Sequence, residues 1–272
     1  GGAFGTQAVD ENMAAAAVIA AVDADAGSQL VYAIVGGADA ARFAINSANG
    51  TLFFVAPPDF EQHNSAAGTS VYDVHVEVSD GVRTDRQTLA ITVNDVNERP
   101  SDAVLGANTI AENAANGSIV GSVVGVDEDV GGSLSYSFAP GGDANGRFTI
   151  DAGTGQITVV NGSLLNFEAT NRQLVVVRVT DQEGLFIDKA LIIDVADVND
   201  APRITSNGAG ATASLAVTEN VISITTVLAD DEDAGDTVSF SIVGGADAGQ
   251  FTINGTTGVL SFVGPRDFEA PA

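Results

Sequence analysis

Apolar and polar residues alternate along several short stretches of this 272-residue chain. The clearest apolar positions are Tyr72, Val74, Val76 and Val78 in one stretch, and Leu89, Ile91 and Val93 in the next. A period of two predicts β-strands that bury one face. Turns rich in Gly, Asn and Asp separate these stretches, which is typical of an all-β sandwich.

Four short motifs recur three times in the same order, so the chain contains internal repeats. A Glu-Asn pair opens each repeat, and an Asp-rich loop follows. The leading aspartates of these loops, Asp23, Asp127 and Asp231, lie 104 residues apart. A Gly-Gly turn and an Asp-Phe-Glu or Asn-Phe-Glu segment come next. The pattern predicts seven-stranded Greek-key sandwiches at 1–97 and 98–199, and a third at 200–272 that lacks its last two strands.

Residues 13–22 are rich in alanine, which favours a helix. The matching segments of the other repeats, 114–126 and 221–229, are rich in Gly, Val, Ile and Thr instead. Equivalent segments of a repeat share a structure, so we expect a strand at 13–22.

Two of the predicted strands end in an acidic segment that a proline stops. Asp95 precedes Pro100, and Asp197 precedes Pro202. Proline cannot continue a β-ladder, so each segment marks a joint between repeats. Calcium takes six to eight oxygen ligands from carboxylates, carbonyls and waters. Loops from one end of a sandwich cluster together, so acids that are distant in sequence can meet at a joint and bind Ca²⁺.

The amino-acid composition excludes several classes of binding partner and metal site. Acidic residues outnumber basic ones 36 to 10, for a formal charge of −26, so nucleic acid and anionic membrane surfaces are unfavourable partners. Cysteine is absent, which excludes disulfides and thiolate metal sites. No apolar run reaches the about 18 residues of a membrane span, and the opening Gly1-Gly2 suggests a piece of a larger exported protein.

The ordered motifs resemble tandem cadherin repeats of the bacterial cadherin-like kind, over nearly the whole chain. The resemblance implies about three calcium ions where the end of one repeat, the linker and the start of the next meet. At the first joint it implies the ligands Glu11, Asp59, Glu61, Asp95, Asn97 (carbonyl), Glu98, Asp127, Asp129 and Asp181. At the second joint it implies Glu112, Asn166, Glu168, Asp197, Asn199 (carbonyl), Asp200, Asp231 and Asp233.

Several positions depart from the family pattern. Glu98 stands where the family has aspartate, and Asn166 replaces an aspartate and removes a charge. The linker lacks a second asparagine, and repeat three has no counterpart of Asp181. We expect two or three ions at the first joint and one or two at the second. Asp23, Asp25 and Asp80 would face a preceding repeat, so we expect a weak site there.

Other candidate chemistry is weaker. The chain has no nucleophile elbow, phosphate loop or histidine-based zinc spacing, so we do not expect an enzyme. Paired carboxylates leave a glycosidase dyad open by residue type, but a catalytic pair would not recur in every repeat. A generally acidic surface without metal is a second alternative. His63 and His75 are expected on the surface, and Asp39, Asp143 and Asp247 in turns.

The sequence therefore predicts a calcium-dependent spacing and adhesion module, extracellular or at the cell surface. Its partner would be another cadherin-like array or a surface polysaccharide. The alternative is a calcium-stabilised polysaccharide-binding array attached to a secreted enzyme. The absence of Trp and the count of three Tyr weigh against that alternative, because sugar platforms usually need exposed aromatic rings.

Overall fold

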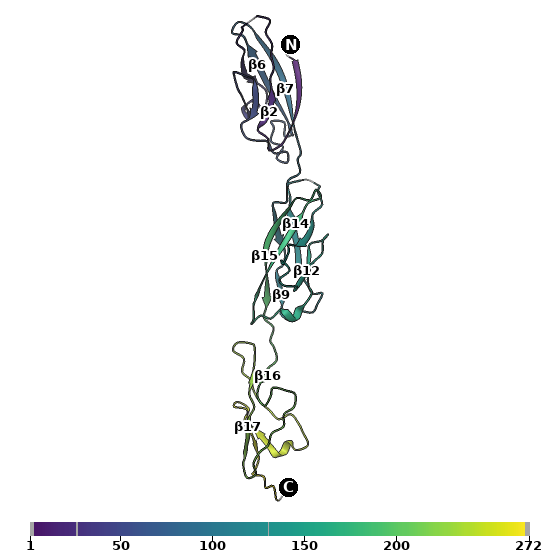
Figure 1. Cartoon of the computed structure of the whole chain (residues 1–272), viewed down its shortest axis with the longest axis vertical. Helices are drawn as coiled ribbons and strands as arrows, with labels where there is room; N and C mark the ends of the chain where they lie inside the picture. The colour runs from purple at the N-terminus through teal and green to yellow at the C-terminus, as the bar shows by residue number, and fades with distance from the viewer. Residues whose placement is uncertain (1–2, 26, 130, 270–272) are drawn as a thin grey trace.

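The computed structural model describes residues 3–25, 27–129 and 131–269, and it consists of β-strands with three short 3₁₀ turns. The strands gather in three bodies that follow one another along the chain and lie end to end (Figure 1). We call these bodies repeats one, two and three. The all-β class and the tandem β-sandwiches are confirmed. The boundaries at 97/98 and 199/200 stay predictions.

Repeat one contains two sheets, with the strand orders β1-β7-β6-β3 and β2-β5-β4. β6 and β7 form a long antiparallel hairpin, and β1 pairs with β7 in parallel. Val74 and Ile91 are fully buried in this hairpin, as the alternation predicts. The strands are β1 (Ala3–Asp10), β2 (Ala15–Val18), β3 (Val31–Gly36), β4 (Phe43–Ile45), β5 (Thr51–Phe54), β6 (Val71–Ser79) and β7 (Thr84–Asn94).

Repeat two has the same layers, with the orders β11-β14-β15-β9 and β12-β13-β10-β8. Its opening strand is divided between the sheets, because β8 pairs with β10 and β9 pairs with β15. The strands are β8 (Asp102–Leu105), β9 (Thr109–Ala111), β10 (Ile119–Val126), β11 (Ser135–Phe138), β12 (Phe148–Ile150), β13 (Gln156–Val159), β14 (Arg172–Thr180) and β15 (Phe186–Ala196).

Repeat three is less complete. Its strands are β16 (Arg203–Ile204), β17 (Ser223–Thr226), β18 (Ala229–Asp230), β19 (Phe251–Ile253) and β20 (Val259–Phe262). Residues 237–243, which align with β3 and β11, form no strand. In repeats one and two these strands pair with β6 and β14, and no such partner is present among the described residues of repeat three.

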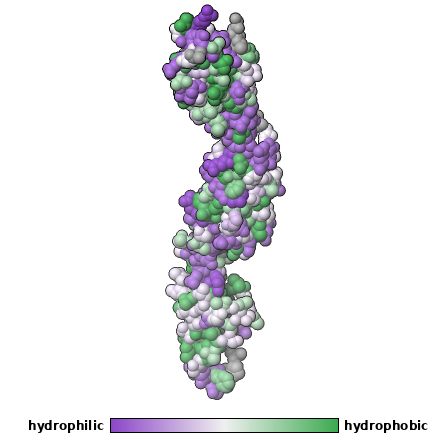
Figure 2. All heavy atoms as spheres, turned by 45° about the horizontal axis from the view of Figure 1, so that its top comes forward, coloured by the Kyte–Doolittle hydropathy of each residue, from purple (hydrophilic) through white to green (hydrophobic). Residues whose placement is uncertain are grey.

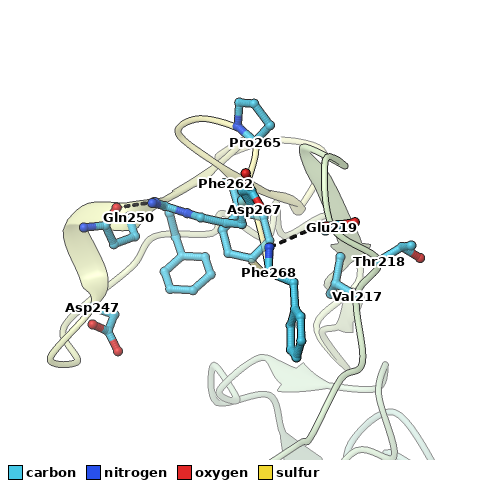
Figure 3. Close-up of a pocket in the computed structure, with 11 residues that line it drawn as sticks. Val217, Thr218, Glu219, Asp247, Gln250, Phe262, Pro265, Asp267 and Phe268 are labelled. Carbon is cyan, nitrogen blue, oxygen red and sulfur yellow. Dashed lines mark hydrogen bonds between the residues drawn. The ribbon is translucent and has the colours of Figure 1, made fainter. Parts of the chain in front are cut away.

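Repeat three contains a hollow of about 800 Å³ (Figure 3). Phe251, Phe262 and Phe268 line it. Phe268 is 83% exposed, whereas its counterparts Phe60 and Phe167 pack against the cores of the first two repeats. Among the described residues of repeat three, no strands cover this hollow as β6 and β7 cover the core of repeat one.

One glycine recurs at the same place in all three repeats, before the strands β5, β13 and β20. Gly50, Gly155 and Gly258 have φ of 72°, 66° and 70°, which other residues adopt only with strain. A Cβ on these glycines would lie 2.0–2.4 Å from the backbone oxygens of residues 19, 123 and 227. Each glycine therefore permits a close crossing of two chain segments.

The alanine-rich stretch at 13–22 contains a strand, as the comparison of repeats predicts. β2 covers Ala15–Val18 and pairs with β5 through an irregular register. It is shorter than the predicted strand. Tertiary pairing outweighs the intrinsic helix preference of alanine here.

Candidate metal centres at the joints

A buried glutamate ties each repeat to the linker that follows it. Glu11 is 3% exposed, and its carboxylate accepts hydrogen bonds from the backbone N–H groups of Phe60, at 2.8 Å, and Val96, at 2.9 Å. Glu112 is 2% exposed and accepts from Phe167 and Val198 at 2.9 and 2.8 Å. The Glu-Asn motif thus holds the Asp-Phe-Glu loop and the linker together.

At the first joint, acids from both repeats converge. Glu11, Glu61 and Glu98 present carboxylate oxygens that all lie within 4.8 Å of one another. Glu61, Asp95 and Asp129 do the same. Glu61 belongs to both groups, and Asp129 comes from repeat two, so the cluster crosses the joint.

Glu98 is the linker acid in the first of these groups. Its backbone N–H donates to Asp129 Oδ2 at 3.0 Å, and its Oε1 accepts from Asn12 Nδ2 at 2.8 Å. Its Oε2 is buried and has no hydrogen-bond partner among the residues that the structure describes. Burial, followed by repulsion from Glu11, Asp129 and other acids, raises the pKa of Glu98 to about 7. The site therefore disfavours the negative charges it gathers.

Neighbouring carboxyls feel the same environment. Burial raises the pKa of Asp127 and outweighs the hydrogen bond from the Asp129 N–H, while repulsion from the Asp129 and Asp181 carboxylates adds to the rise. Burial also raises the pKa of Glu61, with Glu11 and Asp95 contributing repulsion. Because these carboxyl groups are close together and partly removed from water, it is unfavourable for all of them to be ionised at once.

The remaining predicted ligands of the first joint occupy its edges. Asp59 accepts from the backbone N–H and side-chain amide of Gln62, at 2.9 and 2.7 Å. Asp181 accepts three backbone N–H groups of its own loop and the Asn97 Nδ2, at 2.8 Å. Burial acts to raise the pKa of Asp181, but these hydrogen bonds outweigh it and lower the pKa. Asn97 therefore joins the linker to repeat two through its side chain.

The second joint repeats the arrangement. Glu112, Glu168 and Asp200 form one group of carboxylate oxygens within 4.8 Å, and Glu168, Asp197 and Asp233 form another. The backbone N–H of Asp200 donates to Asp233 Oδ2 at 2.6 Å, as Glu98 does to Asp129. Burial raises the pKa of Asp197 and Asp200, and Asp233 and Glu112 add repulsion.

The other predicted residues of the second joint lie beside these groups. Asn166 donates to Glu232 Oε2 at 2.8 Å, across the joint. Asp231 accepts from the backbone N–H of Asp233 at 3.2 Å. The Asn199 amide donates to the backbone oxygen of Asp200 at 2.6 Å. Hydrophilic residues gather at both narrow regions between the repeats (Figure 2).

Three further residues contribute hydrogen bonds at the joints, and the sequence motifs alone assign no role to them. Asn12 and Asn113 adopt φ of 61° and 51° and donate to the linker acids Glu98 and Asp200. The Glu232 carboxylate accepts a hydrogen bond from the Asn166 side-chain amide. The recurring Glu-Asn pair carries the signal for the two asparagines, because Asn tolerates the left-handed region better than most residues.

The two outer ends of the array carry matching groups. Asp23, Asp25 and Asp80 line a hollow of about 530 Å³ at the start of repeat one. Glu219, Asp267 and Glu269 bring carboxylate oxygens within 4.8 Å at the end of repeat three. Acidic side chains therefore gather at both ends of the described chain as well as at the joints.

The donor set fits a hard cation. Carboxylate, carbonyl and amide oxygens are the ligands that Ca²⁺ prefers, and the buried Glu98 Oε2 accepts no hydrogen bond from any described residue. A buried charge of this kind is costly unless a cation or a hydrogen bond compensates it. The geometry matches a divalent ion bound by groups from both repeats.

Comparison with known proteins finds similarity to cadherins. Residues 107–195 match the family model of the cadherin domain. This match lies within repeat two. Protocadherin Fat 4 from Homo sapiens is 29% identical over 261 residues, which is 93% of this chain and 5% of that protein. Cadherin-related family member 2 from Homo sapiens is 28% identical over 267 residues, which is 91% of this chain and 20% of that protein.

Solved cadherin structures share the fold of the whole chain. The crystal structure of mouse Cadherin-23 EC22-24 superposes with a TM-score of 0.67 at 23% identity and covers 99% of this chain and 88% of that one. The Protocadherin GammaB4 extracellular domain gives 0.63 at 23% identity and covers 98% and 44%. The chain spans about 5–20% of the length of the two curated relatives. Within the described parts of the chain, no helix is long and apolar enough to cross a bilayer.

Proposed function

We propose that this chain is an extracellular calcium-binding adhesion module in which Ca²⁺ at the joints fixes the angle between neighbouring cadherin repeats. The observation that carries the proposal is the buried Glu98 Oε2, which has no hydrogen-bond partner in the described parts of the chain and lies within a carboxylate cluster shared by two repeats. Glu11, Glu61, Asp95, Glu98 and Asp129 would hold the ion at the first joint. Glu112, Glu168, Asp197, Asp200 and Asp233 would do so at the second.

Charge explains how an ion would control the joint. Two like charges 4 Å apart repel by about 4 kcal/mol at an effective dielectric of 20. Without a cation, this repulsion favours separation of the repeats. A bound divalent ion supplies the compensating charge, while this chain's carboxylates orient around it from both sides of the linker. At 100 times its dissociation constant, one ion stabilises the bound arrangement by about 2.7 kcal/mol.

The expected affinity suits an extracellular setting. Extracellular calcium modules bind with dissociation constants of about 10⁻⁴–10⁻³ M. We therefore propose two or three ions at the first joint and one or two at the second, in a protein secreted or anchored at the surface. The bacterial origin stays a prediction, since the relatives named above are human proteins.

Adhesion, rather than catalysis, follows from the repeated architecture. A stiff array holds a distal surface away from its anchor, and another cadherin-like array is the partner that we propose. The polysaccharide-binding array stays a prediction from sequence. A glycan array probed in calcium tests it, and reproducible binding of one sugar class would support it.

Calorimetric titration of the whole chain with Ca²⁺ tests the metal proposal. We expect saturable binding at about 10⁻⁴–10⁻³ M and weaker binding of Mg²⁺, which demands stricter octahedral geometry. The melting temperature should rise with calcium concentration. A chain that shows neither binding heat nor a shift in melting temperature at 10 mM calcium would contradict the proposal.

A further inference from the structure

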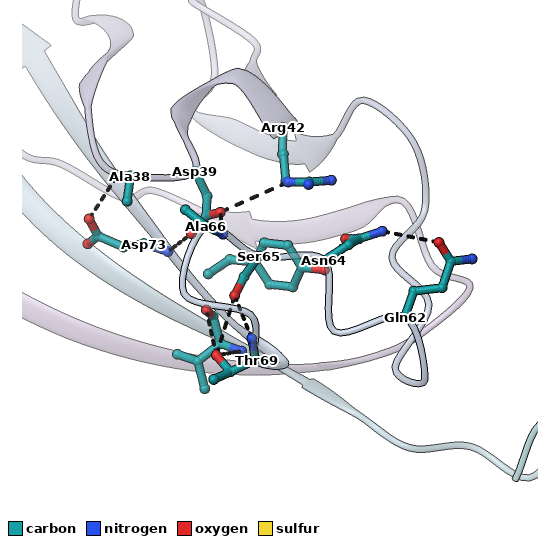
Figure 4. A network of polar contacts seen from close by, with 11 residues as sticks. Ala38, Asp39, Arg42, Gln62, Asn64, Ser65, Ala66, Thr69 and Asp73 are labelled. Carbon is teal, nitrogen blue, oxygen red and sulfur yellow. Dashed lines mark hydrogen bonds and ion pairs between the residues drawn. The ribbon is translucent and has the colours of Figure 1, made fainter. Parts of the chain in front are cut away.

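Repeat one buries a carboxylate that the proposed metal centres do not use. Asp39 is 3% exposed and caps no turn with its side chain. Its Oδ1 accepts the N–H of Ala66 at 2.5 Å, and its Oδ2 accepts that of Asp73 at 2.8 Å (Figure 4). The Arg42 guanidinium lies 4.0 Å away. The side chain thus joins two distant segments, rather than forming the local turn that the sequence suggests.

The segment that Asp39 holds is a long loop. Residues 62–70 connect Glu61 to β6, whereas residues 169–171 alone connect Glu168 to β14. In repeat two the matching Gly-Gly turn carries Asp143, which lies five residues before Phe148 instead of four and is only half-buried. The repeat with the long loop has the fully buried acid, and the repeat with the short loop has a more exposed one.

The loop leads directly to the first joint. Gln62 holds both oxygens of Asp59, and the His63 ring nitrogen Nδ1 lies 3.0 Å from the backbone oxygen of Glu61. The Tyr72 hydroxyl donates to Asn64 Oδ1 at 2.9 Å. His63 adopts φ of 45°, a strained conformation that persists only where its surroundings enforce it.

We propose that Asp39 is a positioning residue for metal binding at the first joint, which it serves by fixing the long loop that presents Asp59 and Glu61. This inference rests on the proposed calcium function. A free nine-residue loop samples many conformations, and their loss on ion binding would weaken the affinity. Asp39 removes these conformations before the ion binds. Loss of a group that orients metal ligands typically weakens metal affinity 10–100-fold.

Repeat three provides a matched control. Asp247 begins the same short 3₁₀ turn, with φ of −105° against −106° for Asp39. It is exposed and lines the hollow of repeat three (Figure 3), and the described residues of this repeat include no counterpart of the loop 62–70. The substitution D247N therefore makes the same chemical change without a loop to release.

Calcium titration of the full chain tests the inference, with the wild type, D39N and D247N compared at a temperature where circular dichroism shows all three folded. We expect D39N to weaken binding at the first joint about tenfold and D247N to leave the isotherm unchanged. Equal affinities for D39N and the wild type overturn the inference, even if D39N melts at a lower temperature. A wild type that binds no calcium overturns the proposed function instead.

A second variant separates positioning from folding. Residues 62–70 are replaced by the Ala-Thr-Asn of residues 169–171, with and without D39A. If Asp39 acts through the loop, both short-loop chains bind calcium with the same affinity, and D39A in the long-loop chain binds more weakly. A loss of affinity on D39A within the short-loop chain overturns the inference, and this comparison holds even if D39N fails to fold.

Discussion

The two joints share one frame but differ in how their charge is held. In both, a buried glutamate bridges the loop and the linker, and a linker acid donates its N–H to an aspartate of the next repeat. At the first joint Glu61 is half-buried, and one buried oxygen of Glu98 has no hydrogen-bond partner within residues 3–25, 27–129 and 131–269. At the second joint the matching Glu168 is exposed. The same motif therefore yields a more desolvated cluster at the first joint.

A difference in side chains also makes the first joint more strongly charged than the second. Asn166 reaches across the second joint as a hydrogen-bond donor, where Asp59 carries a negative charge at the first. The pKa of Glu98 is raised to about 7, so its charge is costly without a partner. A joint that concentrates buried charge depends more strongly on a cation than one that spreads its charge into solvent. We therefore expect the first joint to bind calcium more tightly.

Removing one aspartate from each joint gives the largest expected effect. D129A deletes a carboxylate that repeat two contributes to the first joint, and D233A deletes its counterpart at the second. Each substitution should lower the calcium affinity of its joint about 10–100-fold, because an interaction with a charged group contributes about 1.5–3 kcal/mol. Calorimetry should show a larger loss for D129A. Equal losses would remove the distinction between the joints.

Neutralising Glu98 should have opposite effects with and without calcium. E98Q removes a charge that repels its neighbours. In chelator, thermal unfolding should therefore show that the free energy of unfolding of a repeat flanking the first joint rises by roughly 1 kcal/mol. In calcium the same change removes a ligand and should weaken binding about tenfold. D200N at the second joint is the control and should give smaller changes of the same signs. Destabilisation by E98Q in both conditions would show that repulsion does not dominate the site.

Restoring a charge at the second joint should give the smallest effect. N166D replaces the donor that Asn166 presents to Glu232 with a carboxylate, as Asp59 provides at the first joint. More ligand charge raises calcium affinity, so we expect a few-fold tighter binding at the second joint and a lower stability in chelator. Calorimetric titration measures the first effect and thermal melts measure the second. An unchanged affinity would mean that position 166 lies outside the ion's reach.

Much of this architecture is predictable from the sequence because it repeats. The alternation in β6 and β7 gives the strands and their buried faces, and the repeated motifs give the acids that meet at each joint. Strand β2 also follows, once its alanines are compared with the matching segments of the other repeats. These features depend on local pattern, which a sequence displays directly.

Other features depend on contacts that a single segment does not encode. The sequence places Asp39 in a turn, but its carboxylate reaches segments about 30 residues away. Asn12 looks like part of an opening motif, but its amide reaches a linker acid 86 residues later. The unequal exposure of Glu61 and Glu168 arises from packing around each joint. All three features depend on tertiary contacts between segments that are distant in sequence, and no local sequence pattern indicates such contacts.

Small-angle scattering of the full chain in millimolar calcium and then in chelator tests the central claim most directly. We predict that calcium gives the profile of a stiff rod, and that chelator lowers the radius of gyration and the maximum dimension as the joints loosen. The D129A/D233A double variant in calcium should resemble the wild type in chelator. A wild-type profile that is the same in calcium and in chelator would contradict the account.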